Sequence, residues 1–478
     1  MDVNEPAEIV HELESTIWVR KVNHARSTGN LCRWVSNFHP HRLDCHLVGG
    51  FLYGAYNLGQ KVKFNDGTSW LVRFPRVGNV CIKYVDEKVA MEVEVLHLVR
   101  DKTTIPVPGV KAWGSAALNP LGLGPFIIMD FIEGLSLNAL LKDPTTPNTR
   151  LMRSDIRDSD IEFIYKQMAN FLLQLFHIDF ENIGSVPTTK TGFGGQLRPL
   201  TYKVHDIMQT GGVDSFGDRS QGFQTTTEYF QYILTQDWKQ LSEQSNSIVG
   251  EYDARAKYAC LRTLQSLLPE FVNKKYERGP FKLICDDLGL ANLIVRSPDD
   301  LTIVGVVDLE WSYIGPAQLY GSPWWLLQVR LNNWDTIYDL DAPQIVERFS
   351  RHLKIFKRVL EEEERKLPGN QRELSELVTW SENSGAMWLH MLLSCGFNYA
   401  DNLPFSQLRQ HIGCGKWNQY KELFYGTQSM ESFMKMKLAQ LRQYDLELEK
   451  INEQLYEVQH GRMTEEEFTA RHTYMACV

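Results

Sequence analysis

Residues 281–295 read FKLICDDLGLANLIV, and residues 301–311 read LTIVGVVDLEW. Short apolar runs bounded by polar residues, like those in both stretches, indicate buried strands. Asp287 follows the first run, Asn292 stands five positions later just before the second, and Asp308 ends the third. The pattern therefore predicts two acids and one amide at the ends of neighbouring strands, where they can converge on one point.

Two acids and an amide brought together in this way suit the chemistry of phosphate. Mg²⁺ takes hard oxygen ligands and usually shares its coordination sphere with substrate phosphates. A further carboxylate beside such a metal can orient an attacking hydroxyl group. The alternative interpretation is that Asp287 and Asp308 are ordinary turn residues at strand ends.

The first half of the chain reads as a small sheet with one helix. Residues 46–75 alternate apolar and polar side chains around Asn65-Asp66-Gly67, which is a hairpin turn signal between two strands. The apolar spacing of residues 87–103 is near 3.6, as in a helix. An extended segment follows, and then PFIIMDFIEG (125–134) reads as a buried strand that ends at its last glycine.

Helical patterns dominate the rest of the chain, apart from the strands around Asp287 and Asp308. We therefore expect an α+β fold with two lobes, a small antiparallel sheet with one helix and a large, mainly helical lobe. The expected division is an N-terminal helical extension at 1–45, a phosphate-binding N-lobe at 46–133, a C-lobe at 134–400 and C-terminal helices at 401–478.

The N-lobe contains candidates for holding phosphate. A turn at Gly49 and Gly50 would let the backbone approach a phosphate closely, although an ordinary tight turn is the alternative. Arg73 lies in mid-strand between apolar neighbours, and Glu92 lies 19 residues further on, in the predicted helix. Buried charges are usually paired, so we expect an ion pair between them; the alternative is that Arg73 points to solvent from an edge strand.

These features together resemble the aminoglycoside phosphotransferase-like family, of its divergent fungal kind, within the protein-kinase-like superfamily. The resemblance covers about residues 46–400 and is carried by an ordered set of motifs: VRFP around Arg73, EV at Glu92, IPVP at 105–108, the hinge IIMDFIEG, CDDLGLAN at 285–292, VVDLEW at 306–311 and GSPWWLL at 321–327. It implies a bilobal, protein-kinase-like fold.

The resemblance also implies a role for each matching residue. Asp287 would be the catalytic base, with Asn292 and Asp308 as Mg²⁺ ligands. The nucleotide, ATP or GTP, would be held by the following: Arg73 on its phosphates, Glu92 as the partner of Arg73, Gly49 and Gly50 near the phosphates, and the backbone of Asp130 and Ile132 at the base. The expected reaction is in-line phosphoryl transfer to a hydroxyl of a small molecule.

Two departures from the family pattern keep an alternative open. The family's usual loop begins His-Gly-Asp, whereas this chain has Cys285-Asp286-Asp287, and Arg73 stands where lysine is usual. Arginine keeps the charge but is a planar fork instead of a compact ammonium. The alternative is a weak or inactive pseudokinase that binds nucleotide or acts as an interaction module. The sequence does not identify the acceptor.

Composition excludes several other classes. With 50 basic and 59 acidic residues the net charge is −9, which argues against a nucleic-acid partner. The eight cysteines form no CxxC pair, and no uncharged run is long and unbroken enough to span a bilayer. We expect a cytoplasmic protein.

The apolar seam from Leu441 to Val458 predicts either a helix packed on its own lobe or a weak homodimer through the C-terminal helices.

Overall fold

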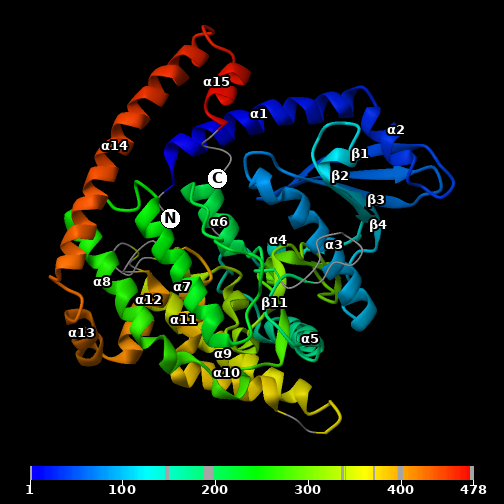
Figure 1. Ribbon diagram of the computed structural model, residues 1–478. Helices are drawn as coiled ribbons and strands as arrows, with labels where there is room; N and C mark the ends of the chain where they lie inside the picture. The colour runs from blue at the N-terminus through cyan, green and yellow to red at the C-terminus, as the bar shows by residue number, and fades with distance from the viewer. Residues whose placement is uncertain are drawn as a thin grey trace.

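The protein is described here from a computed structural model (Figure 1). The structure describes residues 3–145, 150–186, 197–334, 339, 341–369, 372–396 and 402–473. The boundary expected between the C-lobe and the C-terminal helices, at residues 400 and 401, lies outside the described residues.

A five-stranded antiparallel sheet with the strand order β1-β2-β3-β5-β4 forms the N-lobe. Its strands are β1 (Cys45–Tyr53), β2 (Asn57–Phe64), β3 (Ser69–Pro75), β4 (Val110–Gly114) and β5 (Phe126–Asp130). The hairpin predicted at Asn65-Asp66-Gly67 is confirmed, because β2 and β3 pair on either side of it. Three strands precede the helix instead of the expected two, and β5 ends at Asp130, before Gly134.

Helices cover both faces of this sheet. Side chains alternate in direction along a strand, so Trp70, Val72 and Phe74 of β3 pack against α1 (Glu5–Ser27) and α2 (Asn30–Ser36). Leu71 of β3 faces the other way, toward α3 (Val85–Lys102). The same alternation puts Arg73 on the α3 face.

The second lobe is mainly helical and contains two small three-stranded sheets. Its helices are α4 (Leu137–Leu141), α5 (Asp158–Phe176), α6 (Tyr202–Gly211), α7 (Thr226–Glu243), α8 (Glu251–Leu267), α9 (Ala342–Glu364), α10 (Glu373–Ser384), α11 (Ala386–Leu393), α12 (Leu403–Ile412) and α13 (Cys414–Glu422). Its strands are β6 (Leu135–Ser136), β7 (Asp179–Phe180), β8 (Phe281–Cys285), β9 (Leu293–Val295), β10 (Ile303–Val306) and β11 (Ser312–Gly315). The two-lobed α+β class predicted from the sequence is confirmed.

Two pairs of antiparallel strands in this lobe flank the candidate site residues. Strand β8 pairs with β11, and β9 pairs with β10, each antiparallel. The β8–β9 connection contains Asp287 and Asn292, and the β10–β11 connection contains Asp308. The expected convergence of strand ends is therefore present in the fold.

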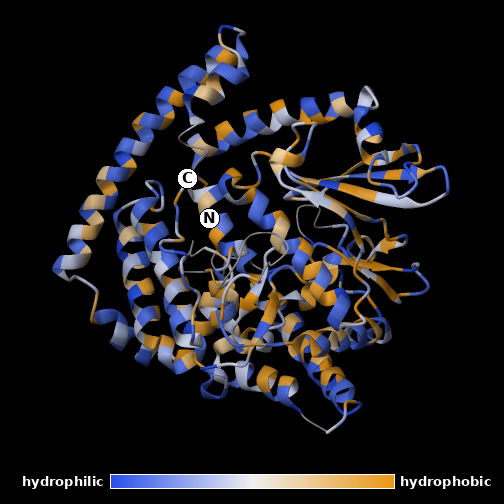
Figure 2. Ribbon diagram, turned by 45° about the vertical axis from the view of Figure 1, so that its right-hand side comes forward, coloured by the Kyte–Doolittle hydropathy of each residue, from blue (hydrophilic) through white to orange (hydrophobic). Residues whose placement is uncertain are grey.

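The C-terminal helices α14 (Gln428–Gln459) and α15 (Glu465–Arg471) return to the N-terminus of the chain (Figure 1). Along α14, apolar and polar residues alternate in a helical pattern (Figure 2). Ile451 of α14 packs with Val10 of α1 and Phe468 of α15, so part of the predicted seam is covered by this chain's own helices. A homodimer through this region stays a prediction.

None of the helices in the described part of the chain combines the length and the apolar content that a bilayer span requires. The expected cytoplasmic location stays a prediction.

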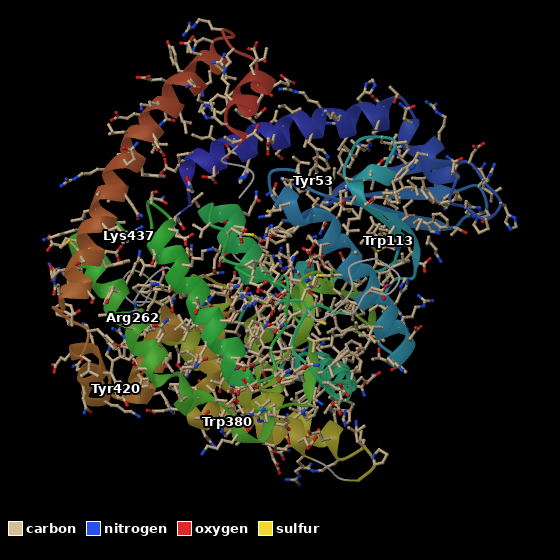
Figure 3. All side chains as sticks on the ribbon, in the orientation of Figure 1. Tyr53, Trp113, Arg262, Trp380, Tyr420 and Lys437 are labelled. Atoms are coloured by element: carbon tan, nitrogen blue, oxygen red, sulfur yellow. The ribbon has the colours of Figure 1, made fainter. Side chains whose placement is uncertain are left out.

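A buried lysine ties α14 to the C-lobe. Lys437, on α14 in Figure 3, is fully buried and donates to the Gln244 carbonyl at 2.6 Å and to Gln440 Oε1 at 2.6 Å. Burial, together with the charge of Lys257, lowers the pKa of Lys437 from 10.5 to about 7. The folded state therefore releases a proton that the unfolded chain holds between pH 7 and 10.5.

We predict that this proton release raises the free energy of unfolding as the pH rises through that window. Lys437→Met should remove the contribution, which we expect to be about 1 kcal/mol or more. Urea unfolding of both proteins at pH 7 and pH 9.5 measures it, with Lys435→Met, an exposed lysine of the same helix, as the control. Parallel pH profiles for the wild type and Lys437→Met would contradict the prediction.

Candidate functional site

The site is organised around the guanidinium of Arg73, which is buried between the two lobes. Its Nη1 lies 2.9 Å from Asp308 Oδ1, and its Nη2 contacts Glu92 Oε2. Glu92 comes from α3 and Asp308 from the β10–β11 connection. The predicted Arg73–Glu92 pair is therefore present, and the same side chain also reaches the C-lobe acid that the sequence assigns to metal binding.

A second buried ion pair crosses the lobes beside the first. Lys88 of α3 contacts Glu310 Oε2, and Asn57 Nδ2 donates to the same oxygen at 2.8 Å. The side chains of Lys88 and Glu310 are both nearly inaccessible to solvent. Sequence reasoning missed this pair, although Glu310 lies two residues after Asp308 in the quoted motif.

The charges in this cleft do not balance. Glu92, Asp287, Asp308 and Glu310 are four acids, whereas Arg73 and Lys88 are two cations, so the acids outnumber the cations paired with them. Burial raises the pKa of Asp308 to about 8, and the neighbouring Glu310 carboxylate adds to the rise against the pull of Arg73. A bound cation would favour the ionised form of Asp308.

The backbone at Asp308 is unusual. Its φ is +63°, in the left-handed region that residues other than glycine rarely adopt. Such a conformation costs about 1 kcal/mol or more and is common at functional sites. Here it accompanies the contact between the Asp308 carboxylate and Arg73.

Asn292 fixes Asp287 in the catalytic loop. Its amide nitrogen donates to Asp287 Oδ2 at 2.9 Å and to the Asp287 carbonyl at 2.8 Å. The amide nitrogen is thereby occupied, and Oδ1 is the atom left to accept a cation. Burial raises the pKa of Asp287, opposed by Arg330 and by the hydrogen bond from Asn292.

Cys285 and Asp286, which precede Asp287, do not share its contact with Asn292. Burial raises the pKa of the Asp286 carboxyl to about 7, and Arg330, the Tyr202 backbone and the Tyr313 side chain oppose that rise. The Asp286 carbonyl accepts from Arg330 Nη2 at 2.5 Å. Burial raises the pKa of the Cys285 thiol to about 12, so that thiol is a poor nucleophile. Asp287, and not Asp286, is paired with Asn292, as the spacing predicted.

The glycine turn that the sequence predicted lies at another position in the structure. Gly49 and Gly50 lie inside β1, at a break in its register between Val48 and Phe51. Gly49 has a φ of +67°, which a bulge uses as readily as a turn does. The turn between β1 and β2 begins instead at Gly54, five residues later, and a nucleotide role for Gly49 and Gly50 stays a prediction.

The expected hinge follows β5. The Asp130 N–H already donates to the Gly109 carbonyl at 3.0 Å, and the Asp130 carboxylate pairs with Lys111 at 2.8 Å. The N–H of Ile132 donates no hydrogen bond to another described residue. Lys61 Nζ lies 3.8 Å from the centre of the Phe131 ring. Of the predicted pair, Ile132 is thus the residue whose N–H remains available to a base.

Among the described residues, no group of three or more His, Cys, Asp or Glu side chains is arranged to hold a metal ion. Asn292 and Asp308 would supply two oxygen ligands, which is the number that Mg²⁺ commonly takes from a protein when phosphates and waters complete its sphere. The donor set therefore suits a metal that arrives with a nucleotide.

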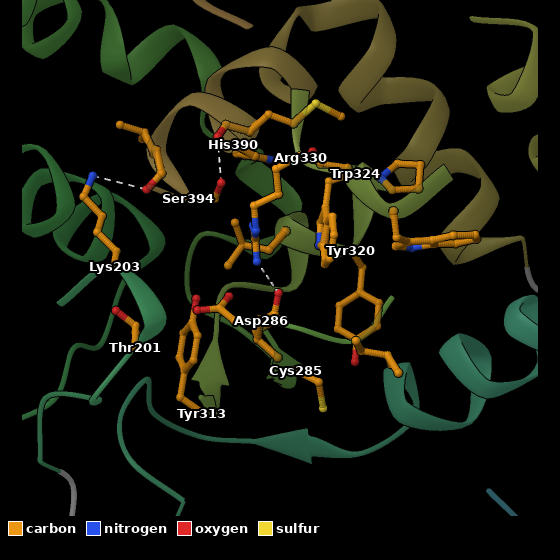
Figure 4. A pocket seen from close by; sticks show the side chains of 18 of the residues that line it. Thr201, Lys203, Cys285, Asp286, Tyr313, Tyr320, Trp324, Arg330, His390 and Ser394 are labelled. Carbon is orange, nitrogen blue, oxygen red and sulfur yellow. Dashed lines mark hydrogen bonds between the residues drawn. The ribbon is translucent and has the colours of Figure 1, made fainter. Parts of the chain in front are cut away.

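A cavity of about 110 Å³ lies on the other side of the catalytic loop (Figure 4). Asp286 and Leu288, the neighbours of Asp287 in the chain, are part of its wall. Figure 4 shows Arg330 pointing toward Asp286, with Tyr313 beside it. Trp324, from the GSPWWLL motif, also lines the cavity, and its ring lies 4.2 Å from the Arg330 guanidinium.

No family model matches the chain. A curated relative, altered inheritance of mitochondria protein 9 of Zygosaccharomyces rouxii, is 26% identical over 140 residues. That match covers 29% of this chain, and it spans about a fifth (21%) of the relative's length.

Similar solved structures are small-molecule phosphotransferases and kinases. One is the macrolide 2'-phosphotransferase MphH of Brachybacterium faecium, at 12% identity, a TM-score of 0.39 and coverage of 84% of this chain and 99% of that one. Another is a microcompartment-associated aminopropanol kinase, at 15% identity, a TM-score of 0.39 and coverage of 79% and 92%. Likenesses this weak establish neither an activity nor a substrate, so the side-chain geometry has to carry the functional argument.

We predict that Lys88→Met destabilises the protein by about 3–5 kcal/mol, because it leaves Glu310 buried without its cation. The double variant Lys88→Met/Glu310→Leu should recover much of this loss, since it removes both buried charges. Denaturant titration measures both. Lys111→Met, which breaks the half-exposed pair with Asp130, is the matched control and should cost less than about 1 kcal/mol. Equal losses for Lys88→Met and Lys111→Met would overturn this interpretation.

Proposed function

We propose that this protein transfers the terminal phosphoryl group of ATP or GTP, with Mg²⁺, to a hydroxyl of a small molecule. One observation carries the proposal: Arg73 contacts both Glu92 and Asp308 while Asn292 holds Asp287. Four separate segments thus bring together a phosphate-binding cation, its helix partner, a metal-binding acid and a positioned base. Phosphoryl transfer depends mainly on positioning and on charge stabilisation, which is what this arrangement supplies.

The residues in the cleft fit a magnesium–nucleotide complex. Asn292 Oδ1 and the Asp308 carboxylate would hold the metal, whose charge would favour the ionised form of Asp308. When bound, Mg²⁺ would neutralise charge on the phosphates. Arg73 would bind the phosphates while Glu92 keeps its guanidinium in place, and the backbone N–H of Ile132 would hold the base.

Asp287 would act on the acceptor. Its carboxylate is oriented by Asn292, and burial raises its pKa, which makes it a better proton acceptor than an exposed aspartate. In the proposed reaction, the acceptor hydroxyl donates its proton to Asp287 as its oxygen attacks the phosphorus in line with the leaving oxygen.

The pseudokinase alternative rests on the Cys285-Asp286-Asp287 loop, which lacks the family's usual histidine. The structure shows other support for this loop. Arg330 donates to the Asp286 carbonyl, and the Tyr202 backbone and the Tyr313 side chain lower the pKa of the Asp286 carboxyl against the effect of burial. These contacts favour the active enzyme, because the base does not depend on a histidine to be held in place.

We predict that substitution of Asp308 and substitution of Asp287 affect different properties of the protein. Asp308→Asn should remove most of the thermal stabilisation by Mg²⁺–ATP, which for a ligand at 100 times its Kd is about 2.7 kcal/mol. Asp287→Asn should keep that stabilisation and lower phosphoryl transfer by about 10²- to 10⁴-fold. Thermal unfolding and a turnover assay over a panel of hydroxylated metabolites measure the two effects.

Asp299→Asn is the matched control, because Asp299 is an exposed acid of the β9–β10 turn. It should resemble the wild type in both measurements. If the wild type binds Mg²⁺–ATP but transfers no phosphoryl group to any compound in the panel, the pseudokinase alternative gains. If Mg²⁺–ATP does not stabilise the wild type at all, the kinase proposal fails.

A further inference from the structure

The cavity behind the catalytic loop is walled mainly by apolar and aromatic side chains. These include Leu172, Phe230, Ile233, Ile284, Leu319 and Trp325. It lies between the α6–α7 region, the β8–β11 pair and the segment that ends at Arg330 (Figure 4). Asp286 and Leu288 line the cavity and Asp287 itself does not, so the hydroxyl of a molecule seated here would have to extend past this wall to reach the proposed base.

The polar groups of the wall already have partners within the protein. His390 contacts Ser322 Oγ at 2.8 Å through Nδ1 and the Gln318 side chain at 2.7 Å through Nε2. Tyr320 donates to the Leu283 carbonyl at 2.5 Å, and Ser394 to the Met391 carbonyl at 2.7 Å. Tyr229 donates to the Tyr313 hydroxyl at 2.7 Å. A ligand would therefore meet apolar side chains and polar groups that already have hydrogen-bond partners.

The charged groups of the wall are also matched. Lys203 lies 2.7 Å from Asp237 Oδ2, and both side chains are buried. Arg330 stacks over Trp324, donates to the Asp286 carbonyl and acts on the Asp286 carboxyl through its charge. The charge of Lys203 is thus balanced by Asp237, and that of Arg330 by the Asp286 carboxylate. Protonation of Asp286 would only leave the wall positive, so in neither state does the cavity present an excess of negative charge.

A charged ligand group in this cavity would lose its hydration without gaining a counter-charge, which is costly. An uncharged apolar body would gain from burial instead. The size also limits the ligand. A dry cavity of about 150 Å³ in another protein takes one benzene ring. A partly open cavity of about 110 Å³ therefore suits one ring or a short branched chain.

We propose that this cavity binds the uncharged apolar body of the acceptor, so that the acceptor is a compact alkyl or aromatic alcohol and not a polycation or a carboxylate. The inference rests on the proposed phosphotransferase function, because that function places the acceptor hydroxyl at Asp287. The binding step, however, is testable without nucleotide.

The test uses three probes that share a phenyl ring and a hydroxyl group: 2-phenylethanol, its cationic analogue 2-amino-2-phenylethanol, and the anionic 3-phenyllactate. Calorimetric titration of the nucleotide-free wild type should give the neutral probe a Kd at least about tenfold lower than either charged probe. Tighter binding of the amine or of the acid would overturn the proposal.

Two variants locate the binding. Trp324→Ala should weaken the binding of 2-phenylethanol about tenfold, because it removes one wall of the cavity. Ile233→Phe should reduce binding by filling it. Trp380→Ala is the matched control, since Trp380 is a half-buried tryptophan of α10 outside the cavity, and it should bind the probe like the wild type (Figure 3). Unchanged binding by Trp324→Ala would place the probe elsewhere and refute the site; this result does not depend on whether Ile233→Phe folds.

Turnover separates failure of this inference from failure of the proposed function. Phosphorylation of 2-phenylethanol in preference to both charged probes supports the inference. If only amino alcohols or aminoglycosides are phosphorylated on a hydroxyl group, the proposed phosphotransferase function stands and the proposed acceptor class is wrong. Probe binding in the cavity without any Mg²⁺–ATP stabilisation would defeat the proposed function and, with it, the assignment of the cavity to an acceptor.

Discussion

The arrangement of the two lobes depends on one buried cation, the guanidinium of Arg73. A buried guanidinium needs negative partners, and this one has Glu92 from the N-lobe helix and Asp308 from the C-lobe. Because the planar fork of arginine presents two nitrogens in fixed directions, it can hold one acid on each side. Lysine would offer a single point of charge. An arginine at this position is thus suited to joining a strand, a helix and a distant loop.

Further ion pairs keep α3 in the position that Arg73 requires. Lys88 of α3 pairs with Glu310, and Glu87 of α3 accepts two hydrogen bonds from Arg219, at 2.7 and 2.6 Å. Both partners belong to the C-lobe. The N-terminal part of α3 is therefore fixed from the second lobe by charges, while its apolar face packs on the sheet. These ion pairs hold the two sides of the cleft together.

Sequence patterns predicted the parts of this site that depend on local spacing. The period of a strand puts Arg73 on the α3 face, and the five-residue step from Asp287 brings Asn292 back to it. The position of the glycine turn was not predictable, because positive φ serves a bulge as well as a turn. The partners of Lys88 and Asp286 were missed for another reason: they lie 222 and 44 residues away, so only the tertiary fold brings them together.

The catalytic loop that carries Asp287 lies between two regions of different electrostatic character. On one side, the carboxyl groups of Glu92, Asp308 and Glu310 outnumber the cations Arg73 and Lys88, which suits a metal and a nucleotide. On the other side, the cavity wall is balanced in charge and satisfied in its hydrogen bonds. A base at such a border can have its pKa raised by burial while it stays next to the cation that the reaction needs. The same catalytic loop would thus hold a charged donor and an uncharged acceptor apart until their reacting oxygens meet at Asp287.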